Sequence, residues 1–234
     1  MRVVAIIPAA GSGSRIGGEI PKQFLKFNGK ELIAYTLDVF QRSEMIDEII
    51  IATSGTGFEY IEDIRERYGY TKISSVVQGG KERQDSVFAA LNAAKLSFND
   101  LAAVHDAARA LIPLEVLNNA IAKAKEAGSA LVCVKARDTI GLIGDNGIEY
   151  IDRNKVILVQ TPQIFKYGEL LKAFNMAYEE GFYGTDESSL MRRAGYPVEI
   201  SDGSSSNFKI TTNEDIKLFE KIKGVSLSSE YLEE

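Results

Sequence analysis

The sequence is poor in the side chains on which many reactions and cross-links depend: its 234 residues include one cysteine, one histidine and no tryptophan. With only Cys133, no disulfide can form within the chain, which fits a reducing compartment, and its apolar neighbours predict a buried, inert thiol. No run reaches the ~20 apolar residues of a membrane-spanning helix. The apolar start at Val3–Ile7 lacks the longer stretch and cleavage site of a signal peptide. We therefore expect a cytoplasmic protein with no membrane partner.

The charge balance excludes another class of partner. The chain carries 27 Lys and Arg against 33 Asp and Glu, a net charge of −6. Nucleic-acid binding favours a basic face, so we expect no nucleic-acid partner. A small anionic ligand remains compatible, because a few basic residues in one cleft can outweigh a mild overall charge.

Short apolar runs alternate with segments of helical periodicity. The runs predicted as buried strands are Val3–Pro8, Glu48–Thr53, Ile73–Val77, Leu101–His105 and Ala130–Val134. The predicted helices are Glu31–Arg42, Arg83–Lys95 and Leu114–Ala127. This alternation predicts an α/β fold with a Rossmann-like, mostly parallel sheet and helices on both faces. We expect a single domain over residues 1–223.

A hairpin and a tail interrupt the alternation. Asp138–Ile143 and Ile148–Ile151 flank a turn that contains Asn-Gly, a strong hairpin signal. A lone hairpin is marginally stable, so this β-arm, about residues 136–156, is expected to pack on something, for example another subunit. Residues 224–234 are polar, and we expect a flexible, non-functional tail.

A glycine-rich turn, Pro8–Arg15, follows the first strand. Glycine and alanine let backbone amides approach a ligand, such turns bind phosphate, and ligands of open α/β sheets lie beyond the carboxyl ends of the strands. The dinucleotide fingerprint fails because its third glycine is replaced by Ile16, and no Gly-Lys-Ser/Thr follows for a P-loop. Arg15 and Lys22 add two cations, which favours a triphosphate. A solvated turn with surface charges is the alternative.

Two further blocks end predicted strands. Gln78–Val87 opens a helix, and its glycines and Ser86 could approach a ligand or simply form a polar helix start. Asp106 follows the fourth strand, where an acid can meet a metal ion carried by phosphates. A buried acid paired with Arg109 is the structural alternative. His105, a lone histidine at a strand end, is more typical of a structural role.

The glycine-rich turn within Pro8–Arg15, together with Pro21–Phe24, resembles the signature of the 2-C-methyl-D-erythritol 4-phosphate cytidylyltransferase family. The similarity covers roughly Arg2 to Lys221. The resemblance implies a nucleotidyltransferase that moves a cytidylyl group from CTP to that sugar-alcohol phosphate and releases pyrophosphate, in non-mevalonate isoprenoid precursor synthesis. It also implies Mg²⁺ or another divalent cation, held mostly by CTP phosphates, with Asp106 as the protein ligand. The residues that it assigns to CTP are Ala9, Ala10, Gly11, Gly13, Gly80 and Ser86.

The resemblance also assigns catalytic and acceptor residues. In the family the β-arm crosses to a second subunit, which implies a homodimer in which Thr139 and Arg153 act in the neighbour's site. Two positions depart from the family pattern, because Ala110 replaces a usual proline and Gly141 a common lysine. Lys209 is expected on a short strand, Asn207–Thr211. The implied catalytic residues are Arg15, Lys22, Lys209 and Arg153, and the implied acceptor residues are Asp106, Arg109, Thr139, Thr161 and Thr185. For Thr185 alone, an ordinary helix N-cap is the alternative.

The chemistry expected here needs no side-chain base. A phosphate monoester has its second pKa near ~6 and is largely dianionic at pH 7, so positioned cations are the main requirement. The alternatives are a ribitol-5-phosphate cytidylyltransferase, a nucleotide-sugar enzyme that uses UTP or ATP, and a non-catalytic nucleotide-binding domain.

Overall fold

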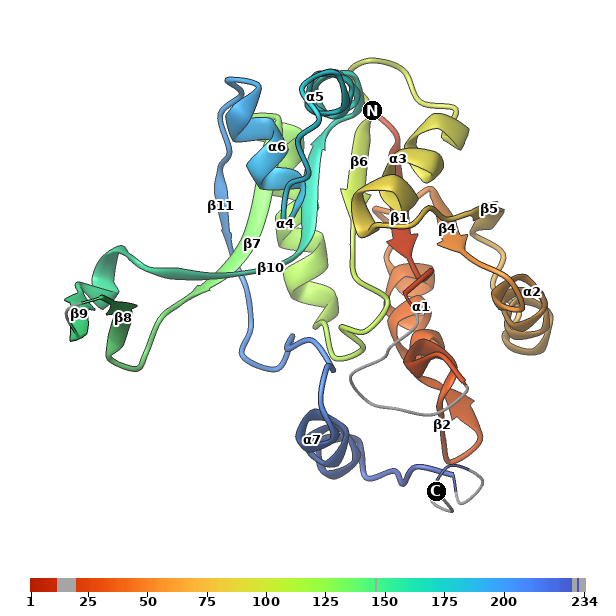
Figure 1. The fold of residues 1–234 in the computed structure, drawn as a ribbon. Coiled ribbons are helices and arrows are strands. Elements are labelled where there is room, and N and C mark those ends of the chain that lie inside the picture. The colour runs from red at the N-terminus through yellow and green to blue at the C-terminus, as the bar shows by residue number, and fades with distance from the viewer. Residues whose placement is uncertain (12–19, 146, 229–230, 232–234) are drawn as a thin grey trace.

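The computed structural model describes residues 1–11, 20–145, 147–228 and 231, and these form a layered α/β structure (Figure 1). A seven-stranded sheet lies at its centre, in the order β11-β7-β10-β6-β1-β4-β5. Only β10 runs antiparallel to its neighbours β6 and β7. The strands are β1 (Val3–Pro8), β4 (Glu48–Thr53), β5 (Ile73–Gln78), β6 (Leu101–Val104), β7 (Ser129–Lys135), β10 (Ile157–Lys166) and β11 (Ile200–Asp202). The mostly parallel sheet predicted from the apolar runs is confirmed.

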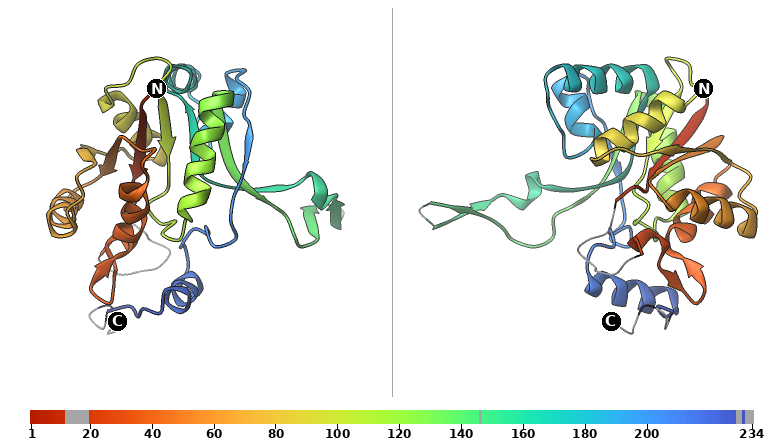
Figure 2. Two further views of the ribbon diagram at one scale, coloured as in Figure 1. Left: turned by 180° about the vertical axis from the view of Figure 1, so that it is seen from behind. Right: turned by 45° about the vertical axis from the view of Figure 1, so that its right-hand side comes forward.

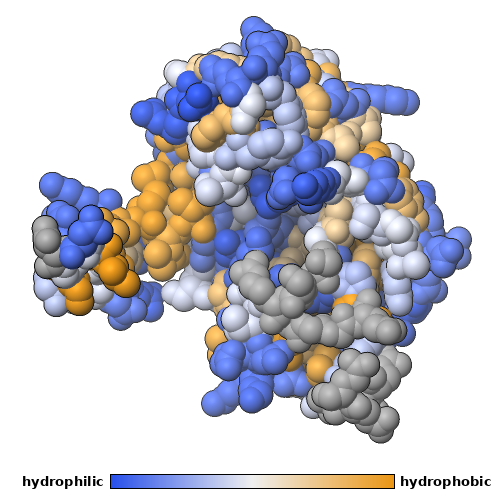
Figure 3. Space-filling view, viewed as in Figure 1, coloured by the Kyte–Doolittle hydropathy of each residue, from blue (hydrophilic) through white to orange (hydrophobic). Residues whose placement is uncertain are grey.

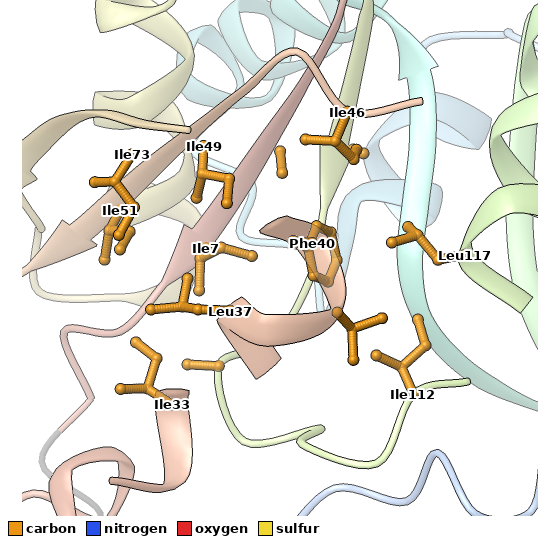
Figure 4. Close-up of a cluster of buried hydrophobic side chains, with 14 of the residues drawn as sticks. Ile7, Ile33, Leu37, Phe40, Ile46, Ile49, Ile51, Ile73, Ile112 and Leu117 are labelled. Carbon is orange, nitrogen blue, oxygen red and sulfur yellow. The ribbon is translucent and has the colours of Figure 1, made fainter. Parts of the chain in front are cut away.

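Helices cover both faces of this sheet because neighbouring residues of its inner strands point to opposite sides. Val3, Ala5 and Ile7 of β1 join the core that packs against α1, α2 and α4, part of which is drawn in Figure 4. Val4 and Ile6 join the core under α3, α5 and α6. The helices are α1 (Leu32–Arg42), α2 (Gly57–Tyr68), α3 (Arg83–Ala93), α4 (Leu114–Ala127), α5 (Tyr167–Glu179), α6 (Glu187–Arg193) and α7 (Asn213–Lys223). No helix in the described ranges has the length and apolar character needed to span a membrane.

The predicted hairpin is confirmed and projects far from the body (Figures 1 and 2). Its strands β8 (Ile140–Gly144) and β9 (Gly147–Ile151) pair antiparallel, with Ile140 opposite Ile151. Apolar side chains on it face outward: Ile143 is 96% exposed and Tyr150 is 72% exposed. Figure 3 shows hydrophobic surface on the arm and where it joins the body. Apolar patches of this kind mark interaction surfaces in many proteins.

The chain end does not behave as the sequence predicted. Strands β2 (Lys26–Phe27) and β3 (Lys30–Glu31) form a small hairpin, and Leu227 makes an antiparallel bridge to Phe27. The backbone amide of Ser228 donates to the carbonyl of Lys26 at 2.9 Å. The expected flexible tail is therefore wrong for residues 225–228, because the edge of β2 offers unpaired backbone groups and a third apolar cluster covers Val225 and Leu227. Residues 229–230 and 232–234 lie outside the described part of the chain.

Candidate active site

A cleft of about 370 Å³ opens beyond the carboxyl ends of β1 and β6, where the sequence placed the ligand. Most of the predicted site residues line it: Ala9, Ala10, Gly11, Lys22, Gly80, Ser86, Asp106 and Lys209. Gly13 and Arg15, which were also predicted, lie outside the described residues.

The wall of the cleft expected to hold the nucleotide is made of two backbone turns that pack together. Gln23 pins the first turn, because its side-chain amide donates to the carbonyl oxygens of Ala9 at 2.6 Å and of Gly11 at 3.0 Å. The amide of Gly80 in the second turn donates to Ser86 Oγ at 3.1 Å. A Cβ at Gly79 would lie 2.5 Å from that of Ala10, so the approach of the turns requires glycine there. Sequence reasoning missed Gln23 as a positioning residue, although it lies in the quoted Pro21–Phe24 block.

Asp106 stands at the centre of a group of cations. Its Oδ1 is 3.0 Å from Arg83 Nε, and its Oδ2 is 3.0 Å from Lys209 Nζ and 3.6 Å from Arg109 Nε. Burial alone would raise the pKa of Asp106, but the charges of Arg83, Lys209 and Arg109 outweigh it and hold that pKa well below its usual range. Asp106 is therefore a carboxylate at neutral pH and a poor proton acceptor. The group around it can position charges but is unsuited to acid–base catalysis.

Two lysines from opposite ends of the chain meet at the cleft. Lys22 lies in a 3-10 turn, Lys22–Phe24, and its Nζ donates to the carbonyl of Ile210 at 2.8 Å. Lys209 precedes Ile210, whose amide donates to the carbonyl of Ala108 at 2.9 Å. The predicted strand Asn207–Thr211 is wrong, because this extended segment follows the loop after β6 and does not join the sheet. Lys22 and Lys209, both expected as catalytic cations, nevertheless line the same cleft.

Arg83 and Glu187 form a partly buried ion pair beside Asp106 that sequence reasoning missed. The fork of Arg83 is bidentate, with Nη1 2.6 Å from Oε1 and Nη2 3.1 Å from Oε2 of Glu187. Burial alone would lower the pKa of Arg83, but the negative charges of Glu187 and Asp106 outweigh it and raise that pKa. One signal was available: Arg83 is the first residue of α3, where the helix dipole disfavours a cation. Glu187 gave no signal, because an acid is ordinary at the start of a helix.

Thr161 and His105 support the loop that carries Asp106. The amide of Asp106 donates to Thr161 Oγ1 at 3.0 Å, and that hydroxyl lies 3.0 Å from His105 Nδ1. Thr161 is buried and does not line the cleft. Burial lowers the pKa of His105 to about 3, so the ring is neutral, and the structural role expected for it agrees with these contacts.

The other predicted acceptor residues lie at the margins. Arg109, whose side chain is 12% exposed, contacts Asp106 and donates to the carbonyl of Asn207 at 2.8 Å. Thr185 is exposed just before α6, and the N-cap of that helix is Asp186, so the cap alternative for Thr185 is wrong. Thr139 and Arg153 flank the strands of the arm and do not line the cleft of their own chain.

The described residues fit a metal ion poorly. No group of three or more His, Cys, Asp or Glu side chains in these parts of the chain could hold one. Both oxygens of Asp106 already contact cations, so a metal ion bound there would have to displace Lys209 or Arg83. The predicted role of Asp106 as the metal ligand does not fit this arrangement.

The architecture and the site together define an α/β nucleotidyltransferase: a mostly parallel sheet, a glycine turn after the first strand and converging lysines at the strand ends. The chain belongs to the 2-C-methyl-D-erythritol 4-phosphate cytidylyltransferase family, whose model matches residues 3–224.

Individual relatives agree with the family match. The chain is 42% identical to the 2-C-methyl-D-erythritol 4-phosphate cytidylyltransferase of Geotalea uraniireducens over 223 residues, which cover 94% of this chain and 96% of that protein. It is similar in structure to the 4-diphosphocytidyl-2C-methyl-D-erythritol synthase of Anaerococcus prevotii, with a TM-score of 0.83, 28% identity and coverage of 95% and 96% of the two chains. The cytidylyltransferase of Francisella tularensis gives a TM-score of 0.80 at 29% identity, covering 94% of this chain and 99% of that one.

Proposed function

We propose that this cleft transfers a cytidylyl group from CTP to 2-C-methyl-D-erythritol 4-phosphate and releases pyrophosphate, as a step in isoprenoid precursor synthesis. A phosphate oxygen of the acceptor attacks the α-phosphorus of CTP. The bond between that phosphorus and the oxygen that joins it to the β-phosphate breaks, and pyrophosphate leaves. The proposal is supported by the family match over residues 3–224. The observation that carries it is the convergence of Lys22 and Lys209 on a cleft walled by the two backbone turns.

The two turns supply the donor site in this proposal. Ala9, Ala10 and Gly11 on one side and Gly80 and Ser86 on the other bind the cytosine and ribose. A base site lined by backbone would favour a pyrimidine over a purine by size. Gly13 stays a predicted CTP-binding residue and Arg15 a predicted catalytic residue.

The cations supply the catalysis. The acceptor phosphate is already largely dianionic, since its second pKa is near ~6, and Asp106 with its low pKa is unsuited to remove a proton. The barrier arises from the approach of two polyanions, and Arg15, Lys22 and Lys209 would stabilise the charge that develops on the α-phosphate and the leaving group. Asp106 holds Lys209 in place at 3.0 Å.

Mg²⁺ is proposed as a companion of the nucleotide, not as an ion resident in the protein. It would neutralise part of the triphosphate charge when it enters with CTP. Because the oxygens of Asp106 are engaged by cations, we assign no protein ligand to it.

The arm is proposed to complete the acceptor site of a second subunit. Thr139 and Arg153 lie on a projecting hairpin whose exposed apolar residues would be covered in a homodimer. Arg109, Thr161 and Thr185 would contact or support the acceptor within one chain. A cytoplasmic location remains a prediction from the sequence. Ribitol 5-phosphate is the alternative acceptor, but the relatives described above carry the methylerythritol name.

Pyrophosphate release from CTP and each acceptor, compared between wild type and Lys22→Ala, tests the function. We expect Lys22→Ala to lower kcat by ~10²–10³-fold, by analogy with the loss of an oxyanion donor. Lys125→Ala is a matched control, because Lys125 is exposed on α4 and does not line the cleft. The proposal would be contradicted if the wild-type protein did not react with CTP or preferred ribitol 5-phosphate. It would also be contradicted if a folded Lys22→Ala variant lost less than about tenfold in kcat.

A further inference from the structure

The proposed reaction gives no task to Arg83 or to Glu187, the carboxylate with which it pairs. Arg83 lines the cleft, and its side chain is 28% exposed, whereas that of Glu187 is 1% exposed. A fully buried carboxylate is costly unless it is paired and hydrogen-bonded, and replacing a buried pair by apolar residues is often neutral or stabilising. A stability role alone therefore gives little reason to place such a pair at the edge of an active site.

The pair is the outer half of a row of four alternating charges. Glu187 binds both Nη atoms of Arg83, at 2.6 and 3.1 Å, and Arg83 Nε binds Asp106 Oδ1 at 3.0 Å. Asp106 Oδ2 in turn lies 3.0 Å from Lys209 Nζ. The four residues come from four places in the chain: the start of α6, the start of α3, the loop after β6 and the segment before α7.

We propose that Arg83 and Glu187 are positioning residues of the reaction. Glu187 fixes the Arg83 guanidinium, Arg83 fixes the carboxylate of Asp106, and that carboxylate fixes the ammonium of Lys209 at the α-phosphate. This inference rests on the proposed function, because Lys209 has a task only if a nucleotide phosphate lies beside it.

The geometry explains why arginine is needed at residue 83. All three guanidinium nitrogens take part, two of them on one carboxylate and the third on another. A lysine ammonium is a single point charge and cannot hold both carboxylates in fixed orientations. If Arg83 is lost, Asp106 keeps its Oδ2 contacts with Lys209 and Arg109 but loses the Oδ1 contact that fixes its orientation, so the carboxylate can rotate and carry Lys209 with it.

The row also reaches the acceptor side of the cleft. Glu187 follows Thr185 and Asp186 directly, so the loop proposed to contact the acceptor is tied to Asp106 through one side chain. The turns that form the nucleotide wall are held by other contacts, those of Gln23 and Ser86. Loss of the pair should therefore affect kcat and the KM for the acceptor more than the KM for CTP.

The test is steady-state pyrophosphate release by wild type, Arg83→Lys, Glu187→Gln and the double variant, with each substrate varied in turn. We expect each single variant to lower kcat by about 10- to 100-fold, the loss typical when a group that orients a ligand-contacting residue is removed. We expect the KM for CTP to stay within about threefold of wild type, and the double variant to lose little more than the worse single one, because the residues act as a unit.

The chain offers a matched control pair. Glu31 is also 1% exposed and accepts a 2.8 Å bond from Arg67 Nη1, but neither residue lines the cleft. We expect Arg67→Lys and Glu31→Gln to lower the Tm as the site variants do and to leave kcat unchanged. This comparison separates positioning from general loss of stability.

Three results would overturn the inference. In the first, folded Arg83→Lys and Glu187→Gln both keep kcat within about threefold of wild type. In the second, the losses of the single variants multiply in the double variant, which shows two independent residues. In the third, the control pair lowers kcat as much as the site pair. If Arg83→Lys does not fold, Glu187→Gln alone decides the matter, because it keeps the shape of the side chain. A wild type that releases no pyrophosphate refutes the proposed function, whereas an active wild type with active variants refutes this inference alone.

Discussion

His105 should make the stability of the fold depend on pH in a range where few other groups titrate. The ring is fully buried beside Phe40, with ring centroids 4.9 Å apart, and burial lowers its pKa to about 3. In the unfolded chain a histidine has a pKa of about 6.5. It is the only histidine in the sequence, so its contribution can be isolated.

The sign follows from proton binding. Below pH ~6.5 the unfolded chain takes up a proton that the folded protein refuses, so stability falls as the pH falls. Each unit of pH between about 6.5 and the folded pKa of about 3 removes up to ~1.4 kcal/mol. Between pH 7 and pH 5 the loss comes to about 2 kcal/mol. Asp106 adds little in this range, because its folded pKa is lowered and its unfolded value is near ~3.9, so its contribution is lost only at lower pH.

Urea denaturation at pH 7 and pH 5, followed by circular dichroism, measures this loss. His105→Gln removes the titrating ring and keeps an amide that can donate near the carbonyl of Arg109, which lies 3.3 Å from His105 Nε2. We expect the variant to be less stable than wild type at pH 7 but to lose about 2 kcal/mol less on acidification. If the stability lost between pH 7 and pH 5 differs by less than about 0.5 kcal/mol between wild type and variant, the reasoning is refuted. His105 would then be protonated without penalty in the folded state.

Three further changes test other parts of the structure. Truncation after Gly224 removes the pairing of Ser226–Ser228 with β2. It should lower the free energy of unfolding by about 2 kcal/mol in urea denaturation, because hydrogen bonds and the burial of Leu227 are lost. Unchanged stability would show that the pairing contributes nothing. Phe219→Ala should cost about 3–5 kcal/mol, because that fully buried ring packs on Phe27 at 4.9 Å, and a loss under about 1 kcal/mol would contradict this account. Ile143→Glu should shift sedimentation toward the monomer and lower activity if the arm completes a second site, whereas an active dimer would contradict that role of the arm.

The sheet could be predicted because its strands carry their own signal. The apolar runs in β1 and β4 have buried residues on both faces, and such strands read as continuous hydrophobic segments. The tail and the Asn207–Thr211 segment could not be predicted in the same way. Their conformation depends on partners far away in sequence. The tail pairs with β2, although its polar composition predicted a flexible segment, and Asn207–Thr211 follows the loop after β6, although its composition predicted a strand.

The residues of the candidate site could likewise be predicted only where their signal is local. The glycine turn and Lys22 could be found because their spacing is local, and Asp106 because it follows a predicted strand, whereas the family resemblance added Lys209. Gln23 and Arg83 escaped because their importance lies in what they bind: backbone carbonyls in one case, and two carboxylates 23 and 104 residues away in the other. The three cationic neighbours of Asp106 could not be predicted, because they come together only in the folded chain.

The contact between Lys22 and Ile210 spans 188 residues and has a consequence during translation. Synthesis proceeds from the N-terminus and a domain generally folds as a unit, whereas β1, β4, β5 and β6 are all complete by residue 104. These four strands therefore emerge while Lys209 is still unsynthesised. Lys22 and Lys209 can meet only when nearly the whole polypeptide has left the ribosome, so we expect chains that end before residue 209 to lack the proposed activity.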